Sequence, residues 1–414
     1  MGATAHVPVR PVDPWLLLVI LTLVFVGTFF VFDASYVKAI ETSFTNNDPF
    51  YFIKRQLVWV VVGFAAFGFG MKLGYWNLRR VAPTLLLIAF LLLIAVLIPG
   101  IGRKIEGARR WMQFGPVRLQ PSEVAKIFLM IFVANYLAQN PRSIRRLQDG
   151  FLPILALIGV VCGLILIEPD MGTMLATVGV STALLFVGGA RGKHIAMFIA
   201  GGVVAVGLLC VIEPWRMERL LAFLNPWHDP DGSGYQVLQG LAALGSGGVF
   251  GLGPGESRAK WLYLPAEHTD FIFAIIGEEI GLLGGLGILG LFLFLAWRGF
   301  VIAGKCTNRF GRLLAIGIAL TIGGQAMMNI CVVCTLLPAT GVPLPLISFG
   351  GSSLVLTMFA LGVLTDISRR PKLPWDNEDH DSGSNRRWDR GPYIPGSGDR
   401  RGSRKTGRVP PVYR

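Results

Sequence analysis

The chain has 414 residues, of which 53% are hydrophobic and only 15% are charged, and its mean hydropathy is +0.58. A soluble protein of this length needs a larger polar surface, so the composition excludes a soluble globular fold and indicates a polytopic membrane protein. The formal net charge is +13, and much of that excess lies in the last part of the chain.

Ten apolar segments are long enough, or nearly so, to cross about 30 Å of hydrocarbon as helices. They lie near residues 14–32, 55–71, 81–99, 121–138, 151–167, 171–189, 195–213, 270–297, 313–337 and 344–366. The fifth and sixth form a hairpin, because Glu168-Pro169-Asp170 between them is too polar for the bilayer centre. The first has no small-residue cleavage pattern behind it, so we expect a retained span. The sequence therefore predicts an all-α membrane domain over residues 14–370.

Ten spans place both termini on the same side of the membrane. The basic residues that fall on this side are Arg10, Lys72, Arg79, Arg80, Arg142, Arg145, Arg146, Arg191, Lys193, Arg298, Lys305, Arg309 and Arg312. The positive-inside rule makes this side cytoplasmic, so residues 1–13 form a cytoplasmic N-terminus. Residues 371–414 are rich in Gly, Ser, Pro and Arg with almost no aliphatic residues, which predicts a disordered basic cytoplasmic tail.

Basic residues also occur on the outer side, against the same rule. The loop between the third and fourth spans carries Arg103, Lys104, Arg109, Arg110 and Arg118, and the long loop before the eighth span carries Arg216, Arg219, Arg258 and Lys260. Arg and Lys grouped at a membrane surface suit phosphate or pyrophosphate groups. Each one alone is as simply explained by lipid headgroups or by Glu106, Glu218 and Glu256. For the whole set we predict an anionic substrate.

The large outer loop, about residues 214–269 between the seventh and eighth spans, is the main part of the chain outside the spans. Hydrophobic residues interleaved from Tyr235 to Leu244 predict an amphipathic helix at the membrane surface. The glycine-rich stretch that follows permits tight turns and close backbone approach to a ligand. It is not a nucleotide loop, because it lacks the Lys-Ser/Thr ending of such loops.

Asp270 lies where this polar loop enters the eighth apolar segment. An acid in such a position is desolvated on one side and still meets water or substrate on the other, so its pKa can be tuned for proton transfer. We therefore predict that Asp270 carries the chemistry. The alternative is that Asp270 only caps its helix, a role that aspartate fills often.

Two further polar segments adjoin spans. Glu123 and Lys126 follow Pro121 at the start of the fourth span and are three residues apart, which predicts an intramembrane ion pair. The segment that opens the last span carries three prolines, Pro338, Pro343 and Pro345. Proline frees helix carbonyls, so this segment must be buried in protein or line a wet cavity.

Together these motifs closely resemble the SEDS family of bacterial membrane glycosyltransferases, which comprises FtsW, RodA and SpoVE proteins. The resemblance covers roughly residues 12–370 in order. The string from Phe223 to Gly234 and the spacing of Gly253-Pro254-Gly255-Glu256-Ser257 before Leu264 are more similar to FtsW and SpoVE than to RodA. Two departures are Ala266-Glu267, where the family commonly has Glu-Ala, and Glu168, where many members carry Gln.

The resemblance implies polymerisation of lipid II into glycan strands at the outer face of the bacterial cytoplasmic (inner) membrane, with cell division as the FtsW-like role. Asp270 matches the family's essential aspartate, the general base that takes the proton of the acceptor hydroxyl. The candidate substrate-binding residues are Arg109, Arg110, Trp111, Arg216, Lys260, Glu123, Lys126, Ser257, His268 and Thr269. Arg109, Arg110, Arg216 and Lys260 are the candidates for the pyrophosphate, and Trp111 is alternatively an interfacial anchor.

A divalent cation, magnesium or manganese, is a candidate helper, and no organic cofactor or nucleic acid is expected. The implied partners are a class B penicillin-binding protein, which is a transpeptidase, and other division proteins. RodA-like elongation and SpoVE-like sporulation are alternative roles. A transporter that flips lipid II is a rival, since polar residues and prolines inside spans also occur in transporters, and a scaffold for the transpeptidase is another.

Overall fold

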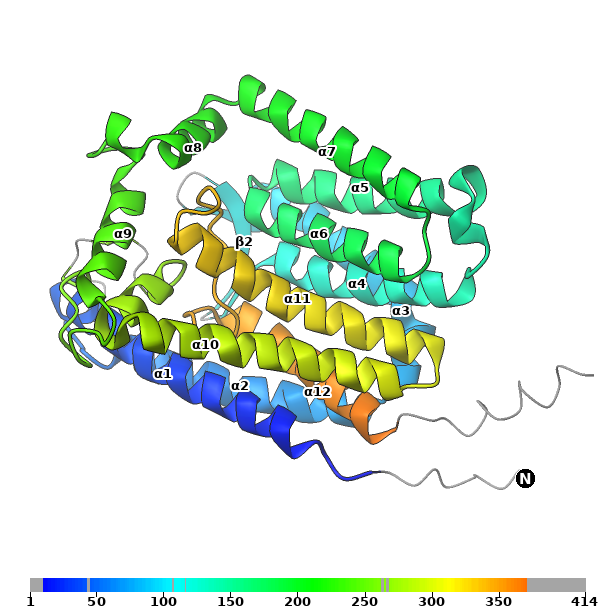
Figure 1. The fold of residues 1–414 in the computed structure, drawn as a ribbon, viewed down its shortest axis with the longest axis horizontal. Coiled ribbons are helices and arrows are strands. Elements are labelled where there is room, and N and C mark those ends of the chain that lie inside the picture. The colour runs from blue at the N-terminus through cyan, green and yellow to red at the C-terminus, as the bar shows by residue number, and fades with distance from the viewer. Residues whose placement is uncertain are drawn as a thin grey trace, which may run out of the picture. The chain divides into compact units, whose positions relative to one another are not determined.

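The protein is a bundle of long helices that lie roughly along one direction (Figure 1). The computed structural model describes residues 10–42, 45–105, 108–115, 117–261, 264–265 and 268–370. The expected tail at 371–414, most of the N-terminus, Glu106 and Glu267 lie outside these ranges.

Nine helices of the described ranges are long and apolar enough to cross a membrane. They are α1 (Pro14–Glu41), α2 (Tyr51–Leu73), α3 (Tyr75–Leu97), α4 (Pro121–Gln139), α5 (Leu152–Ile167) with the preceding turn η3 (Leu147–Phe151), α7 (Gly192–Ile212), α10 (Ile272–Lys305), α11 (Arg309–Val333) and α12 (Gly351–Arg369). A shorter apolar helix, α6 (Met171–Val187), pairs with α5. Each of the ten expected segments coincides with one of these helices, which confirms the predicted fold class.

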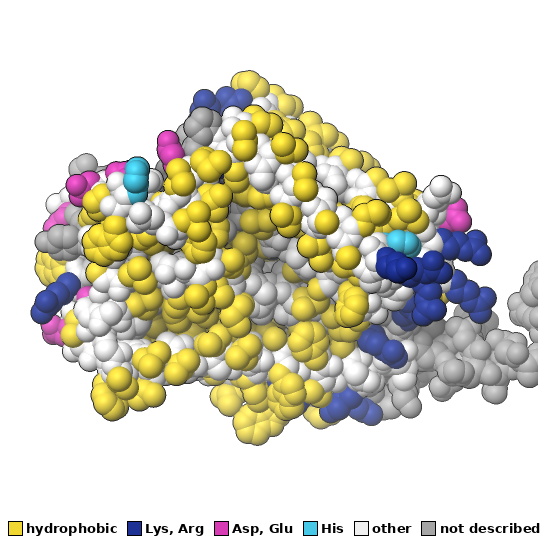
Figure 2. All heavy atoms as spheres, turned by 45° about the horizontal axis from the view of Figure 1, so that its top comes forward, with side chains coloured by type: hydrophobic (Ala, Val, Ile, Leu, Met, Phe, Trp, Pro, Cys, Tyr) yellow, Lys and Arg dark blue, Asp and Glu magenta, His cyan; other side chains and the backbone are white. Residues whose placement is uncertain are grey.

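The two ends of the bundle differ in charge. The backbone N–H of Arg10 donates to the carbonyl of Arg369 at 3.0 Å, so the described N- and C-terminal ends meet at one end of the bundle. Lys and Arg gather at this end in Figure 2, whereas Asp and Glu lie mainly at the other. The opposite end carries a small β-sheet, α8 (Pro214–Leu224) and α9 (Tyr235–Gly247), and is the outer end in the expected topology.

Capping side chains fix where several helices begin. Asp13 accepts hydrogen bonds from the backbone of Trp15 at 3.1 Å and Leu16 at 3.3 Å at the start of α1, and it also pairs with Arg298 of α10. Asn308 caps α11 in the same manner. Each cap satisfies backbone donors that the first helical turn leaves without partners.

The most deeply buried spans are α4 and α12, whereas α7 is the most exposed. Small residues let α2 and α12 approach closely, as is common between membrane helices. A Cβ on Gly70 would lie 2.5 Å from the carbonyl oxygen of Phe359, and one on Gly362 would lie 2.1 Å from that of Phe67. A larger side chain at either glycine would therefore force the two helices apart.

The connection between α3 and α4 contains a three-stranded antiparallel sheet of β1 (Gly102–Ile105), β2 (Ala108–Phe114) and β3 (Val117–Leu119). The sequence predicts only a basic loop here. The strands are short and rich in charge, so they lack the run of alternating hydrophobic residues that signals a strand.

The expected helix at 235–244 is present as α9, and residues of its apolar face pack against α10. Buried Val237, Gly240 and Ala243 lie on this helix, which packs against α10. A Cβ on Gly240 would lie 2.9 Å from the ring of Phe271 just before α10. The predicted helix is confirmed. Its buried residues contact protein, although the sequence predicts that its apolar face contacts the membrane surface.

Helix α10 is broken at Gly281, whose φ of 68° and ψ of −170° are not helical. The sequence predicts one uninterrupted span here. A break inside a span leaves backbone groups that must find partners within the protein. The glycine-rich stretch supplies them, since Leu252 N donates to Glu278 O at 3.0 Å and Leu282 N donates to Gly248 O at 3.0 Å. A Cβ on Gly281 would lie 2.3 Å from the backbone nitrogen of Gly251.

Candidate active site

Asp270 lies in a turn that leads into α10. The helix begins at Ile272 with Phe271 at the cap position and no side-chain cap, so the interpretation of Asp270 as the N-cap is wrong. Asp270 is half-buried, and a Cβ on Gly341 would lie 3.4 Å from its Oδ2. The carboxylate therefore lies beside the backbone of Gly341, where the outer loop joins the helix bundle. This partly exposed position is compatible with a role as proton acceptor.

Two amide side chains of α11 fix the connection between α11 and α12 against this turn. Asn329 Nδ2 donates to the carbonyls of both Asp270 and Val342 at 2.8 Å. Gln325 Nε2 donates to Pro343 O at 2.9 Å. These bonds satisfy carbonyls of the proline-rich segment, which was expected to need protein partners. They also hold the backbone of Asp270 in place.

The two residues before Asp270 contribute mainly through their backbones. Ser348 Oγ donates to Thr269 O at 2.6 Å, and Phe349 N donates to His268 O at 3.0 Å. The buried imidazole of His268 lies 4.9 Å from the ring of Phe52 and 5.7 Å from that of Phe349, measured between centroids. Both predicted binding residues thus position the turn that carries Asp270, and their contact with substrate stays a prediction.

The predicted ion pair of α4 is confirmed. Lys126 Nζ lies 2.8 Å from Glu123 Oε1, and both side chains are almost fully buried. The same ammonium donates to Gln325 Oε1 at 2.6 Å. Because Gln325 also holds Pro343, a continuous polar chain runs from α4 through α11 to the proline-rich segment.

The turn between α5 and α6 adds a second acid to this region. Asp170 Oδ2 accepts from Gln120 Nε2 at 2.7 Å and from Ser122 Oγ at 2.8 Å, and its Oδ1 accepts from Thr173 N at 3.1 Å. Three donors hold this carboxylate in place at the start of α6. A Cβ on Gly172 would lie 2.4 Å from the carbonyl oxygen of Thr340, so the turn borders the segment that contains Gly341.

Glu168 in the same turn has a different character. It is fully buried, and neither of its carboxylate oxygens has a hydrogen-bond partner among the described residues. Burial, and secondarily the charge of Asp170, raise the pKa of Glu168 to about 9. Glu168 is therefore protonated at neutral pH, which makes it a poor alternative to Asp270 as a base.

Lys260 lies in a buried network and not on an open surface. Its ammonium is 3.0 Å from Asp33 Oδ1 of α1, 3.2 Å from Glu279 Oε1 of α10 and 2.5 Å from the carbonyl oxygen of Gly255. Two carboxylates compensate its charge, so little positive potential remains for an anionic ligand. This arrangement gives Lys260 a structural role that the sequence did not reveal and weakens its selection as a pyrophosphate ligand.

Ser257 belongs to the same buried region. Its Oγ donates to Glu278 Oε2 at 2.5 Å and its backbone N donates to Glu279 Oε1 at 3.2 Å. The backbone N–H groups of Arg258 and Ala259 also donate to Glu278. The two adjacent glutamates before the break of α10 thus organise the loop segment around Ser257, and contact of Ser257 with substrate stays a prediction.

The remaining predicted ligands lie on two other elements. Arg109, Arg110 and Trp111 are consecutive residues of β2, and the pairing with β1 shifts at Arg110, since Trp111 pairs with Arg103 and Arg109 with Lys104. Arg109 Nη1 donates to Leu97 O at the end of α3 at 3.2 Å. Arg216 on α8 is buried, and its Nε lies 3.4 Å from Glu213 Oε2. The four predicted cations therefore belong to three separate parts of the chain: β2, α8 and the loop before α10.

A resident metal centre is not preformed in the described part of the chain. Within it, no three His, Cys, Asp or Glu side chains come together in a group that could hold a metal ion. Stable protein sites for magnesium or manganese use several oxygen ligands.

Comparison with known sequences places this architecture among cell cycle proteins. The family model FTSW_RODA_SPOVE, described as "Cell cycle protein", matches residues 14–373. Stage V sporulation protein E of Bacillus subtilis is 42% identical over 362 residues, which cover 87% of this chain and 98% of that protein. A probable peptidoglycan glycosyltransferase FtsW of Trichlorobacter lovleyi is 42% identical over 364 residues, which cover 87% of this chain and 94% of that protein.

Solved structures show the same fold. A chain of a peptidoglycan synthase complex, described as coordinating polymerization and crosslinking, matches with a TM-score of 0.72 and 32% identity over 87% of this chain and 98% of its own length. The rod shape determining protein RodA of Thermus thermophilus matches with a TM-score of 0.63 and 30% identity over 86% of this chain and 97% of its own length.

Proposed function

Because this chain belongs to the FtsW/RodA/SpoVE family of peptidoglycan glycosyltransferases, we propose that it polymerises lipid II with Asp270 as the general base. The observation that supports this role is the placement of Asp270. It lies outside the helix, half-buried, with its backbone held by Asn329 and its carboxylate beside Gly341. A base must be held within hydrogen-bond reach of the proton that it abstracts, and this turn provides such a support.

In this mechanism Asp270 takes the proton of the acceptor sugar hydroxyl. The hydroxyl oxygen forms a bond to the anomeric carbon of the donor sugar, and the bond from that carbon to the lipid pyrophosphate breaks. The pyrophosphate leaves with the electron pair and needs positive charge near it. We propose Arg110 and Arg216 for this task first, with Arg109 as a further candidate and with a magnesium or manganese ion on the pyrophosphate as a helper.

The biological role that we propose is cell division, as for the FtsW relatives. The B. subtilis sporulation protein is equally similar in sequence, so the sporulation role is the main alternative. We further propose that the protein lies in the cytoplasmic membrane with both termini in the cytoplasm. The meeting of Arg10 and Arg369 at the basic end of the bundle supports this orientation.

We also propose a class B penicillin-binding protein as partner, whose single transmembrane helix packs against α10 and α11. The peptidoglycan synthase complex with the same fold supports such an assembly. Leu282, Leu283 and Leu286 of α10 are exposed on the surface, and a Cβ on Gly287 would meet no atom within 4 Å. Gly281 of the same helix is not available to this surface, because it packs against the backbone of Gly251.

Co-purification tests the partner surface. Gly287→Leu adds bulk to the open face of α10, so it should reduce recovery of the transpeptidase without loss of the folded protein. Gly304→Leu is the control, because it is open in the same helix at the opposite, basic end. Equal recovery with both variants would place the partner elsewhere.

Turnover of lipid II by the purified full-length chain tests the function itself. We expect glycan strands from the wild type, alone or with the transpeptidase added, and none from Asp270→Asn. Movement of lipid II across vesicles without any polymer in either condition would instead support the flippase hypothesis.

A further inference from the structure

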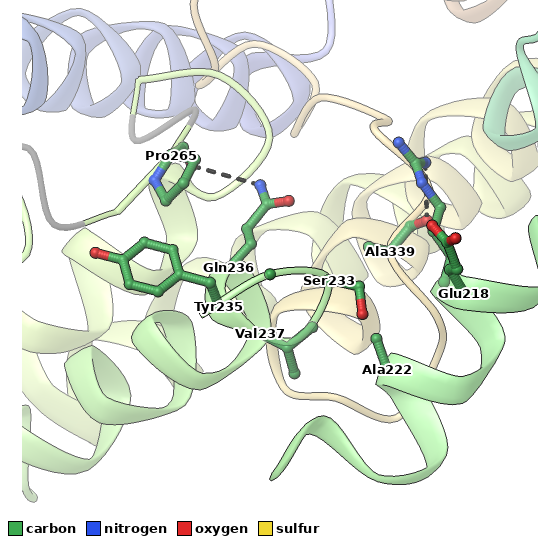
Figure 3. A pocket seen from close by; sticks show the side chains of 10 residues that line it. Glu218, Ala222, Ser233, Tyr235, Gln236, Val237, Pro265 and Ala339 are labelled. Atoms are coloured by element: carbon green, nitrogen blue, oxygen red, sulfur yellow. Dashed lines mark hydrogen bonds between the residues drawn. The ribbon is translucent and has the colours of Figure 1, made fainter. Parts of the chain in front are cut away.

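A pocket of about 410 Å³ opens at the outer end between α8, the start of α9 and two loops (Figure 3). Its lining residues come from four chain segments and are Glu218, Arg219, Ala222, Gly232, Ser233, Tyr235, Gln236, Val237, Pro265 and Ala339. The volume lies within the usual range for small-molecule sites, about 300–1,000 Å³. Of these positions, only Arg219 belongs to the basic set for which the sequence predicts an anionic substrate, and none is among the named candidate site residues.

Two hydrogen bonds connect the walls of this pocket to the loops on either side of Asp270. Gln236 Nε2 donates to Pro265 O at 3.4 Å, and Arg219 Nη1 donates to Ala339 O at 3.3 Å (Figure 3). Ala339 is two residues before Gly341, and two residues span at most about 7.6 Å between Cα atoms. Because Gly341 adjoins the Asp270 carboxylate, the floor of the pocket lies close to the proposed base.

The chemistry of the lining decides which part of a substrate the pocket suits. Its one arginine already binds a backbone carbonyl, and the carboxylate of Glu218 beside it repels phosphate. The amide oxygen of Gln236 points away from Pro265 in Figure 3, and the hydroxyl of Ser233 borders the same space. Ala222 and Val237 add apolar surface. Oxygen acceptors mixed with apolar surface fit a hydroxylated, uncharged ring better than a pyrophosphate.

We infer that this pocket is a saccharide subsite that holds an N-acetylhexosamine unit of the glycan strand next to the reacting sugar. The inference rests on the proposed function, because it assigns the pocket to the strand that the reaction lengthens. A subsite of this kind positions the acceptor hydroxyl near Asp270 and gives the enzyme affinity for its own product. In this arrangement the lipid pyrophosphate binds outside the pocket, at the cations proposed above, Arg110 and Arg216.

Binding of a defined sugar to the full-length protein tests the inference independently of turnover. The probe is chitotetraose, an uncharged chain of N-acetylhexosamines, titrated into the detergent-solubilised wild type. Ser233→Trp fills the pocket from an exposed position, and Ser233→Ala is its matched control, since it removes the hydroxyl but leaves the space open. We expect Ser233→Trp to bind the sugar at least about tenfold more weakly than Ser233→Ala, which corresponds to ~1.4 kcal/mol. Leu224→Trp on the exposed side of α8 should bind as the wild type does.

Removal of one negative charge from the pocket distinguishes a sugar from a cationic peptide stem as the occupant. Glu218→Gln keeps a hydrogen-bond acceptor, so it should change chitotetraose affinity by less than about threefold, or well under ~1 kcal/mol. If a cationic stem peptide binds the wild type and loses affinity in Glu218→Gln while chitotetraose does not bind, the saccharide assignment is overturned.

Polymerisation by the same variants shows which proposal fails if one does. We expect Ser233→Trp to give shorter glycan strands and a higher KM for lipid II than Ser233→Ala. If the wild type makes polymer and the two Ser233 variants match it in KM, strand length and chitotetraose binding, the subsite inference is wrong and the proposed function stands. The proposed function is wrong if the wild type makes no polymer under any condition, even though it binds chitotetraose and Ser233→Trp binds this sugar more weakly than Ser233→Ala.

Discussion

Lys260 and Asp33 are 227 residues apart in the chain, yet the ammonium of one lies 3.0 Å from the carboxylate of the other in a buried pair. The pair joins the loop before the proposed active site to the first span. Glu279 shares the same ammonium at 3.2 Å, so the contact also includes α10 beside its break. The main effect of a substitution at Lys260 is therefore expected on the fold of this loop, and not on contacts with substrate.

Lys260→Met should destabilise the protein, because it leaves the carboxylates of Asp33 and Glu279 buried without their cation. Breaking a buried pair in this way typically costs about 3–5 kcal/mol. Unfolding of the purified protein in mixed micelles measures the loss. Lys54→Met is the control, since Lys54 pairs with Asp48 at the exposed surface and should change stability little. Equal stability of both variants would show that the Lys260 network does not hold the loop.

Asp270→Asn should reduce glycan polymer formation by about 10²- to 10⁴-fold, the usual contribution of a general base. The fold should survive, because Asp270 does not cap α10 and Asn329 binds its backbone carbonyl, which the substitution keeps. Gel analysis of strands made from lipid II measures the rate. Asp231→Asn in the exposed part of the same loop serves as control and should polymerise normally. A near wild-type rate for Asp270→Asn would remove Asp270 from the mechanism.

Glu168→Gln should stabilise the protein at neutral and alkaline pH. The folded pKa of Glu168 is about 9, whereas its ordinary value is 4.5, so between these values the folded state holds a proton that the unfolded state releases. Unfolding free energy therefore falls as pH rises from about 4.5 to 9. Glutamine mimics the protonated acid and removes this dependence. Thermal unfolding at pH 5, 7 and 8.5 measures it, and parallel curves for variant and wild type would refute the raised pKa.

Gly281→Ala should destabilise the break in α10. The residue has a φ of 68°, and a Cβ there would lie 2.3 Å from Gly251 N, so strain of about 1–3 kcal/mol or more is expected. Gly287→Ala is the matched control in the same helix. Its Cβ meets nothing within 4 Å, and alanine is the better helix former by about 1 kcal/mol. Opposite shifts in unfolding midpoint are expected, and a stable Gly281→Ala would argue against the break.

Local sequence patterns were sufficient to predict the membrane-spanning helices and the contacts within one helix. Apolar length predicted all ten spans, and the spacing of Glu123 and Lys126 predicted their ion pair, because both features depend on neighbours in one segment. The position of Asp270 at a seam of polar and apolar sequence was equally visible.

Contacts between distant segments were not visible in the same way. Lys260 appeared to be a surface cation because its partner Asp33 lies in another span. The break at Gly281 was missed although Glu278 and Glu279 interrupt the apolar pattern just before it. The backbone of residues 248–253 compensates for the break, and backbone bonding leaves no side-chain signal in the sequence. The pocket beside α8 arises from four segments, none of which carries a motif.

The pairing of the glycine-rich stretch with α10 also orders the events of synthesis. Leu252 and Glu278 are 26 positions apart, so their hydrogen bond can form as soon as α10 leaves the ribosome, at a modest cost in loop-closure entropy. The bond from Asn329 to Asp270 spans 59 positions and must wait for α11, and the bond from Ser348 to Thr269 spans 79 and comes later still. Domains are made from the N-terminus onward at about 5–20 residues per second, so a chain stalled before α11 can hold its broken helix already built but no finished catalytic turn. The turn that carries Asp270 is therefore completed only when α11 and the connection that follows it have been made.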